Sequence, residues 1–188
     1  MSWLTTIIGY LIGAIPTAYI AGRLLKGKDI RQLGDHNIGA QNAFRELSPA
    51  IGISVGIIDA CKGALAILIA RGFGVSLPAV MVAGVACVVG HNWPVFLGFR
   101  GGRGESPTIG IFYVLLTQPM LILSAPALLA LILTRNVIVA SVFFFVPLPL
   151  VAWWRGANVA IIIYCLGLLF LVAFTHFLRV RNPTVRQA

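Results

Sequence analysis

The sequence is short of acidic residues and of charge altogether. Only five of its 188 residues are Asp or Glu, and charged residues of both signs make up 10% of the chain. Soluble globular domains carry about 25% charged residues, so the composition excludes that class. Disorder requires low hydrophobicity, whereas 59% of this chain is apolar and its mean hydropathy is +0.96. We therefore expect a polytopic membrane protein without a large extramembrane domain.

Cysteine is scarce as well. Cys61, Cys87 and Cys165 lie far apart in apolar stretches and form no CxxC or Cys/His cluster. This argues against a disulfide framework and a zinc site, and we expect neither a metal ion nor a cofactor. The 14 Lys and Arg residues give a net charge of +9, but a nucleic-acid binder would display them on a polar surface. We expect no nucleic-acid partner.

The apolar residues gather in six runs: Trp3–Leu25, Ala50–Ala70, Leu77–Leu97, Ile109–Leu133, Val137–Trp154 and Ala157–Leu178. A spanning helix needs about 20 residues. The fourth run is interrupted by Gln118-Pro119 and Pro126, and proline breaks the helical hydrogen-bond ladder. Read as two short pieces it gives seven spans, and read as one kinked helix it gives six.

The basic residues favour seven spans, because cytoplasmic loops collect Lys and Arg. Seven spans place eleven basic residues on one side: Arg23, Lys26, Lys28, Arg31, Arg45, Arg100, Arg103, Arg135, Arg179, Arg181 and Arg186. Only Arg71 and Arg155 fall on the other side. Six spans divide the same residues eight to five. We predict a single all-α membrane domain over residues 1–188 with about seven transmembrane helices, its N-terminus outside and its C-terminus in the cytoplasm.

Two loops on the predicted cytoplasmic face are rich in glycine and polar residues. The first runs from Gly34 to Asn42 and is followed by Arg45, and the second runs from Gly90 to Gly104 and contains Arg103. Glycine lets successive backbone N–H groups converge on anionic oxygen, and a neighbouring arginine adds charge-assisted contacts. Together the loops predict a phosphate site at the membrane boundary. The alternative is tight turns whose arginines reach lipid headgroups.

The remaining polar residues favour structural roles. Asp59 and Lys62 share a helix face inside an apolar run, where they either pair with each other or take part directly in chemistry. The residues five positions after His36, His91 and His176 are Gln41, Phe96 and Arg181, so the His-x4-Asp motif that one class of acyltransferases uses is absent. A Gly-x-Ser-x-Gly elbow and a Walker loop are absent too, and we expect the histidines to form structural hydrogen bonds.

Five blocks of residues occur in a specific order over nearly the whole chain. They are Gly13-Ala14-Ile15-Pro16; Asn37-Ile38-Gly39-Ala40 with Asn42 and Arg45; Asp59, Lys62 and Gly63; Gly90-His91, Pro94-Val95-Phe96-Leu97 and Gly101, Gly102 and Gly104; and Ala140-Ser141. In order and spacing the chain resembles the bacterial membrane glycerol-3-phosphate acyltransferases that use acyl phosphate as donor. It departs from the family pattern at Asp35, His36, Gln41, Arg103 and Glu105-Ser106-Pro107, where the family has Ser, Gly, Thr, Lys and Val-Ala-Thr.

The resemblance implies transfer of a fatty acyl group from acyl phosphate to the 1-hydroxyl of glycerol 3-phosphate, which gives lysophosphatidate and phosphate. We expect catalytic roles for Asp35 and Arg103, with Asp35 either binding an acceptor hydroxyl or acting as a base. Phosphate and substrate would be held by Asn37, Gly39, Asn42, Arg45, Gly101, Gly102, Gly104, Ser141 and His176. Asp59, Lys62 and His91 would hold the helices in register.

Two other functions stay open from the sequence. The chain could be a non-catalytic membrane paralog, such as a small transporter or a lipid-binding protein, or an acyltransferase with a different phosphorylated acceptor. The resemblance places it in a bacterial inner membrane among membrane lipids, with both glycine-rich loops in the cytoplasm.

Overall fold

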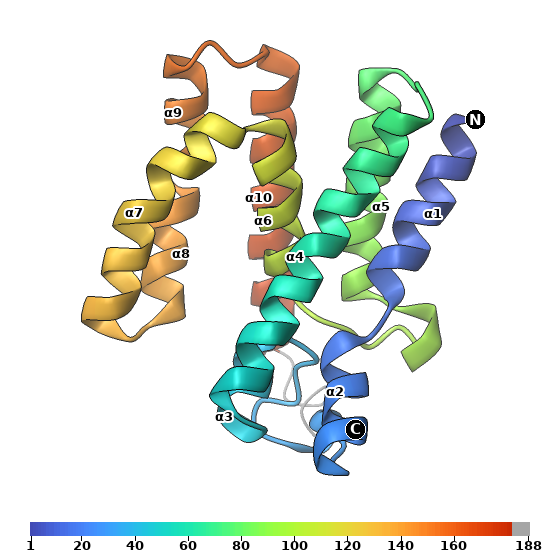
Figure 1. Cartoon of the computed structure of the whole chain (residues 1–188), viewed down its shortest axis with the longest axis vertical. Helices are drawn as coiled ribbons and strands as arrows, with labels where there is room; N and C mark the ends of the chain where they lie inside the picture. Colours follow the sequence, from blue (N-terminus) through green and yellow to red (C-terminus); the bar gives the residue numbers. More distant parts are fainter. Residues whose placement is uncertain (182–188) are drawn as a thin grey trace. The chain divides into compact units, whose positions relative to one another are not determined.

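The computed structural model describes residues 1–181, and every regular element in that part of the chain is helical (Figure 1). This confirms the expected all-α fold. Arg186, which enters the charge count above, lies outside the described residues. In chain order the elements are α1 (Ser2–Ala14), α2 (Thr17–Lys26), η1 (Ile30–Gln32), α3 (Ala40–Glu46), α4 (Pro49–Gly72), α5 (Leu77–Asn92), η2 (Val95–Leu97), α6 (Glu105–Leu115), α7 (Thr117–Thr134), α8 (Val137–Phe145), α9 (Leu148–Trp154) and α10 (Val159–Arg181).

Within the described residues, six helical segments are long and apolar enough to cross a membrane: Ser2–Lys26, Pro49–Gly72, Leu77–Leu97, Thr117–Thr134, Val137–Trp154 and Val159–Leu178. The interrupted fourth run divides at Leu116 into α6 and α7. Pro119 falls in the first turn of α7, where backbone N–H groups have no helical partner. Because α6 has only 11 residues, it is not among the six, and the seven-span topology stays a prediction.

The first apolar run does not form the single helix that the sequence suggested. It breaks at Ile15 and Pro16 into α1 and α2, with Ile15 in an extended conformation. The residue before a proline is disfavoured in helical geometry. At the break the Ile15 carbonyl accepts a hydrogen bond from the Thr17 backbone N–H at 3.1 Å, and it also accepts one from Lys62 on α4.

The chain forms two compact units, and the single domain expected from the sequence stays a prediction. In the described part, one unit comprises residues 1–111 and 171–181, and the other comprises Phe112–Phe170. In the first unit α1 packs along α5 (Figure 1). A side chain at Gly9 or Gly13 would overlap the backbone of Ala83 or Cys87, so these glycines permit close helix packing.

The second unit contains α7, α8 and α9. The Phe145 ring makes edge-to-face contacts with the rings of Phe112 and Phe144, and the Tyr113 and Ser124 hydroxyls are 2.6 Å apart. Large apolar side chains cover the outer faces of this unit and of the first, as expected for helices that lie against lipid.

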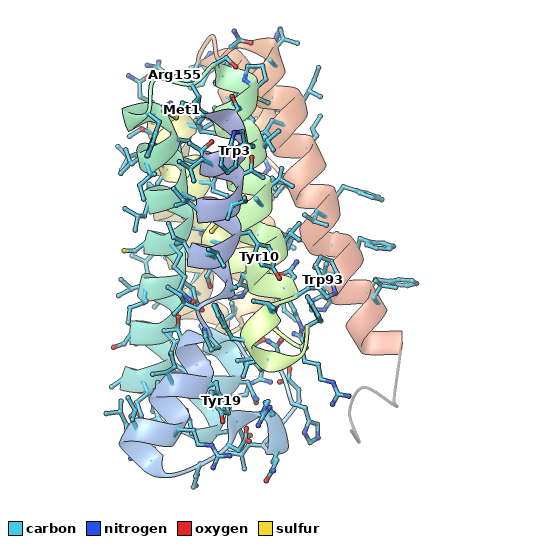
Figure 2. The ribbon with its side chains drawn as sticks, turned by 90° about the vertical axis from the view of Figure 1, so that its right-hand side faces the viewer. Met1, Trp3, Tyr10, Tyr19, Trp93 and Arg155 are labelled. Carbon is cyan, nitrogen blue, oxygen red and sulfur yellow. The ribbon has the colours of Figure 1, made fainter. Side chains whose placement is uncertain are left out.

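Asp29 connects the end of α2 to η1. Its carboxylate accepts a hydrogen bond from the Arg31 backbone N–H and lies 2.9 and 2.7 Å from the Arg23 and Arg31 guanidinium groups. Both guanidinium groups also contact the Tyr19 ring, which Figure 2 labels. The hydrogen bonds from Arg31 lower the pKa of Asp29 from 3.8 to about 2, against the opposing effect of its burial.

This pKa shift predicts a pH-dependent contribution to stability. A carboxyl group with a lowered folded-state pKa stabilises the fold above its unfolded pKa of 3.8, and this contribution disappears as the pH falls toward 2. We expect Asp29→Asn to lower the free energy of unfolding by about 1 kcal/mol at pH 7, because solvent screens the two half-exposed arginines. Thermal unfolding in detergent between pH 7 and pH 2 measures it. A difference from wild type that persists at pH 2 would contradict the assignment.

Candidate functional site

The first glycine-rich loop folds around the side chain of Asn42, which projects from α3. The Asn42 amide nitrogen donates to the carbonyls of Leu33 and Asn37, both at 3.0 Å, and lies 3.4 Å from the Ile30 carbonyl. Asn42 is buried, so its amide hydrogens are used within the loop. In this arrangement Asn42 shapes the loop, and its expected contact with phosphate stays a prediction.

Asp35 and His36 occupy a tight bend in this loop. Gly34 and His36 both have positive φ angles, of 56° and 58°, and the His36 Nδ1 is 2.8 Å from the Arg31 carbonyl. The Asp35 Oδ1 accepts a hydrogen bond from the Asn37 backbone N–H at 3.2 Å, which is an Asx turn. One carboxylate oxygen is thus fixed by the backbone, and the other is directed away from the bend.

The second glycine-rich loop packs against the end of α5. The Gly102 backbone N–H donates to the His91 carbonyl at 2.9 Å, and a side chain at Gly102 would overlap the His91 imidazole. A side chain at Gly101 would overlap the His91 carbonyl, and Gly104 has a positive φ of 83°. The sequence suggested a phosphate cradle here. The structure supplies a steric reason for the same glycines, and their contact with phosphate stays a prediction.

Tyr10 braces this turn from α1. Its hydroxyl donates to the Trp93 carbonyl at 2.9 Å, and Figure 2 shows Tyr10 and Trp93 near each other. Sequence reasoning did not identify this contact, because the two residues are 83 positions apart and neither belongs to a recognisable motif.

Arg103 joins the two loops. Its Nη2 lies 2.8 Å from the Asp35 Oδ2 in an ion pair, while its backbone carbonyl accepts a hydrogen bond from the Thr175 hydroxyl of α10 at 3.0 Å. The two side chains are 18% and 33% exposed, so the pair is partly accessible to solvent. The structure therefore brings together the two residues for which the sequence suggested catalytic roles.

A polar cavity of about 350 Å³ lies beside this ion pair. It is lined by Gly34, Asp35, His36, Asn42, Arg45 and Glu46. Arg45 and Glu46 come from the last turn of α3, and Asn37 is buried in the loop nearby. Arg45 supplies positive charge to a cavity that also contains two carboxylates, so the cavity suits a small polar molecule that carries both a phosphate and hydroxyl groups.

Asp59 and Lys62 form the ion pair that their spacing allows. The Lys62 Nζ is 2.7 Å from the Asp59 Oδ1, and both side chains are almost completely buried. The Thr17 hydroxyl donates to the same carboxylate oxygen at 2.7 Å, and Lys62 also donates to the Thr17 hydroxyl and the Ile15 carbonyl. The pair thus holds α4 against the break between α1 and α2, and the His91 Nδ1 lies 3.9 Å from Asp59.

The last two candidates belong to different units. His176 follows Thr175 on α10 and belongs to the first unit, together with both loops. Ser141 belongs to the second unit, where its hydroxyl donates to the Val137 carbonyl at 2.9 Å. The expected contact of each residue with the acceptor stays a prediction. In the described part of the chain, no group of three or more His, Cys, Asp or Glu side chains could hold a metal ion.

The close packing of the second loop predicts that Gly102→Ala is destabilising. The added methyl group would overlap the His91 imidazole in a buried position, and overpacking of this kind costs about 1–3 kcal/mol. Thermal unfolding in detergent measures the loss. Gly72→Ala is the matched control, since a side chain there meets open space at a helix end. Equal melting temperatures for the two variants would show that the loop does not depend on this contact.

Comparisons with known proteins agree with the resemblance seen in the sequence. Residues 3–183 match a family model described as glycerol-3-phosphate acyltransferase. Glycerol-3-phosphate acyltransferase 4 of Dehalococcoides mccartyi is 47% identical over 97% of this chain and 98% of its own length. The glycerol-3-phosphate acyltransferase of a Synechococcus species is 34% identical over 93% of this chain and 88% of its own.

Two solved structures share the fold. Both are crystal structures of PlsY (YgiH), an integral membrane glycerol 3-phosphate acyltransferase. The glycerol 3-phosphate form superposes with a TM-score of 0.85 and 29% identity, over 95% of this chain and 90% of that one. The lysophosphatidic acid form gives 0.81 and 28%, over 93% and 87%.

Proposed function

The chain belongs to the glycerol-3-phosphate acyltransferase family of integral membrane enzymes, and we propose that it transfers a fatty acyl group from acyl phosphate to the 1-hydroxyl of glycerol 3-phosphate. The hydroxyl oxygen forms a bond to the acyl carbonyl carbon, and the bond from that carbon to the phosphate oxygen breaks. The hydroxyl proton passes to the released phosphate. The products are lysophosphatidate and inorganic phosphate, so the reaction belongs to phospholipid synthesis.

The observation that carries this proposal is the position of Arg45 and Arg103 about one polar cavity. Arg45 lines the cavity, and Arg103 contacts Asp35 in its wall. Two guanidinium groups at one site suit the two phosphate groups that the proposed reaction brings together. The cavity is also large enough for glycerol 3-phosphate, while the donor's acyl chain would remain in the membrane.

The proposed reaction requires the protein to bind both substrates and to stabilise the developing charge. Acyl phosphate is already activated, so a covalent enzyme intermediate is not required. Holding both reactants in attack geometry removes an entropic barrier of up to about 7–11 kcal/mol in ideal cases. Arginine and backbone donors stabilise the charge that develops on the carbonyl oxygen and on the leaving phosphate.

A reconstitution assay tests the proposal. Purified protein in lipid nanodiscs receives palmitoyl phosphate and radiolabelled glycerol 3-phosphate, and the expected result is equimolar lysophosphatidate and phosphate. A parallel reaction with palmitoyl-CoA tests the choice of donor. A panel of other phosphorylated alcohols tests the acceptor, since Asp35 and Glu46 give the cavity an acidic character. The proposal is wrong if no lysophosphatidate forms under conditions in which a family relative is active.

The distribution of basic residues supports an orientation in a bacterial inner membrane with both glycine-rich loops in the cytoplasm. The first loop is flanked by Arg31 and Arg45, and the second contains Arg100 and Arg103. Reporter fusions after Gly74 and Arg100 would test it. We expect an alkaline phosphatase fusion to be active only after Gly74, and the opposite pattern would reverse the orientation.

A further inference from the structure

We infer that the Asp35 carboxylate pairs with the Arg103 guanidinium in the absence of substrate, and that a substrate phosphate displaces this carboxylate when it binds. This inference rests on the proposed function, because it gives Arg103 a phosphate to bind. In the structure the positive charge of Arg103 is already neutralised by a carboxylate 2.8 Å away. A phosphate that is to bind at the same Nη2 must displace this carboxylate, so the ion pair acts as a latch between the two glycine-rich loops.

Both partners of the latch belong to anchored loop segments: a backbone N–H holds the Asp35 side chain, and the Thr175 side chain holds the Arg103 backbone. The Asx turn to the Asn37 N–H fixes the Asp35 Oδ1 and leaves the Oδ2 for Arg103. On the other side, the Thr175 hydroxyl donates to the Arg103 carbonyl and so fastens the second loop to α10. These two hydrogen bonds distinguish the latch from an ion pair between flexible surface side chains.

The latch is weak enough for a ligand to open. Its side chains are 18% and 33% exposed, and a partly exposed ion pair contributes about 1 kcal/mol or less. A phosphate with a charge near −2 competes favourably with a single carboxylate for one arginine.

The inference predicts that removing the Asp35 charge strengthens phosphate binding. Asp35→Asn and Asp35→Ser both keep an oxygen that can accept from the Asn37 N–H, so the loop retains its turn. We expect each variant to bind inorganic phosphate and glycerol 3-phosphate about fivefold more tightly, the factor that corresponds to about 1 kcal/mol. Isothermal titration calorimetry in nanodiscs measures the affinity, and initial rates give the KM for glycerol 3-phosphate.

Two controls separate the latch from a general effect of charge. Glu46→Gln removes a carboxylate that lines the same cavity but that has no ion pair with Arg103 among the described contacts. Its gain in affinity measures the general effect of charge, and we expect it to be smaller than the gain of Asp35→Asn. In an Arg103→Ala background, we expect Asp35→Ser to give no gain in phosphate affinity, because the guanidinium group with which the carboxylate pairs is absent. A gain that survives without Arg103 would overturn the inference.

Two further results for the Asp35 variants would also overturn the inference. Weaker phosphate binding in both Asp35 variants, or unchanged binding, would show that Asp35 does not compete with phosphate. A loss of kcat of more than about 100-fold with unchanged KM would instead make Asp35 a base. Inorganic phosphate binding requires no turnover, so the latch is measured even if lysophosphatidate does not form, and the two proposals fail separately.

Discussion

Replacing Arg103 by alanine is expected to lower kcat/KM for lysophosphatidate formation by about 10²–10³-fold. Removal of one preorganised donor from a developing oxyanion costs about this much in well-studied enzymes. Arg103 forms an ion pair with Asp35, which lines the cavity, so its loss would also leave the Asp35 carboxylate to repel phosphate. Steady-state rates with palmitoyl phosphate and glycerol 3-phosphate in nanodiscs measure the effect.

Two further variants show whether this loss comes from the Arg103 contact or from the charge of the loop. Arg100 is an exposed arginine three residues earlier in the same loop, and we expect Arg100→Ala to retain activity within about twofold. Arg103→Lys keeps the positive charge without the planar fork of donors, and we expect it to retain at least a tenth of the activity. Equal losses of activity in Arg100→Ala and Arg103→Ala would show that Arg103 contributes only through the positive charge of the loop.

Part of the geometry of the candidate site could be predicted from the sequence, and the function of its residues stays a prediction. The sequence predicted that Asp35, Arg45 and Arg103 matter and that the two glycine-rich loops act together, and the structure places Asp35 and Arg103 in contact. It did not predict that these two side chains neutralise each other. Positions 35 and 103 are separated by three α-helices and one 3-10 helix, and periodicity or loop composition contains no information about which side chains of two distant loops meet.

The glycines of the second loop show a different limit of sequence reasoning. A glycine cluster is compatible both with an anion cradle and with close packing, and the sequence cannot show what lies opposite each glycine. The structure places the His91 imidazole and carbonyl against Gly102 and Gly101. The same ambiguity applies to Asn42, whose amide could have reached a phosphate but binds the loop carbonyls of Leu33 and Asn37 instead.

The helices were easier to predict than their interruptions. Long apolar runs indicate where helices lie, because a membrane leaves no other solution for backbone polar groups. The break at Ile15 and Pro16 was not expected, although the proline was visible. A proline in an apolar run either kinks a helix or ends it, and local composition does not distinguish the two. Here the helix ends, and Lys62, a residue 47 positions from Ile15, donates a hydrogen bond to the Ile15 carbonyl.

The buried ion pair between Asp59 and Lys62 predicts a large loss of stability when Asp59 is replaced by alanine. Lys62 would remain buried with a positive charge and only the Thr17 hydroxyl and Ile15 carbonyl as partners. Breaking a buried ion pair from one side costs about 3–5 kcal/mol. For a chain of this size we expect the melting temperature to fall by about 10 °C. Thermal unfolding in detergent, followed by tryptophan fluorescence, measures it.

The double variant Asp59→Ala with Lys62→Met identifies the source of the loss. Replacing both charges leaves no unpaired ion, and such replacements are often close to neutral, so we expect the double variant to melt above Asp59→Ala alone. Ile58→Ala is the matched control, because Ile58 precedes Asp59 on α4 but is exposed. If the double variant melts below Asp59→Ala, the decisive contacts are those of Lys62 with Ile15 and Thr17. The pair would then act mainly by joining α4 to the break between α1 and α2, and the unpaired charge would be secondary.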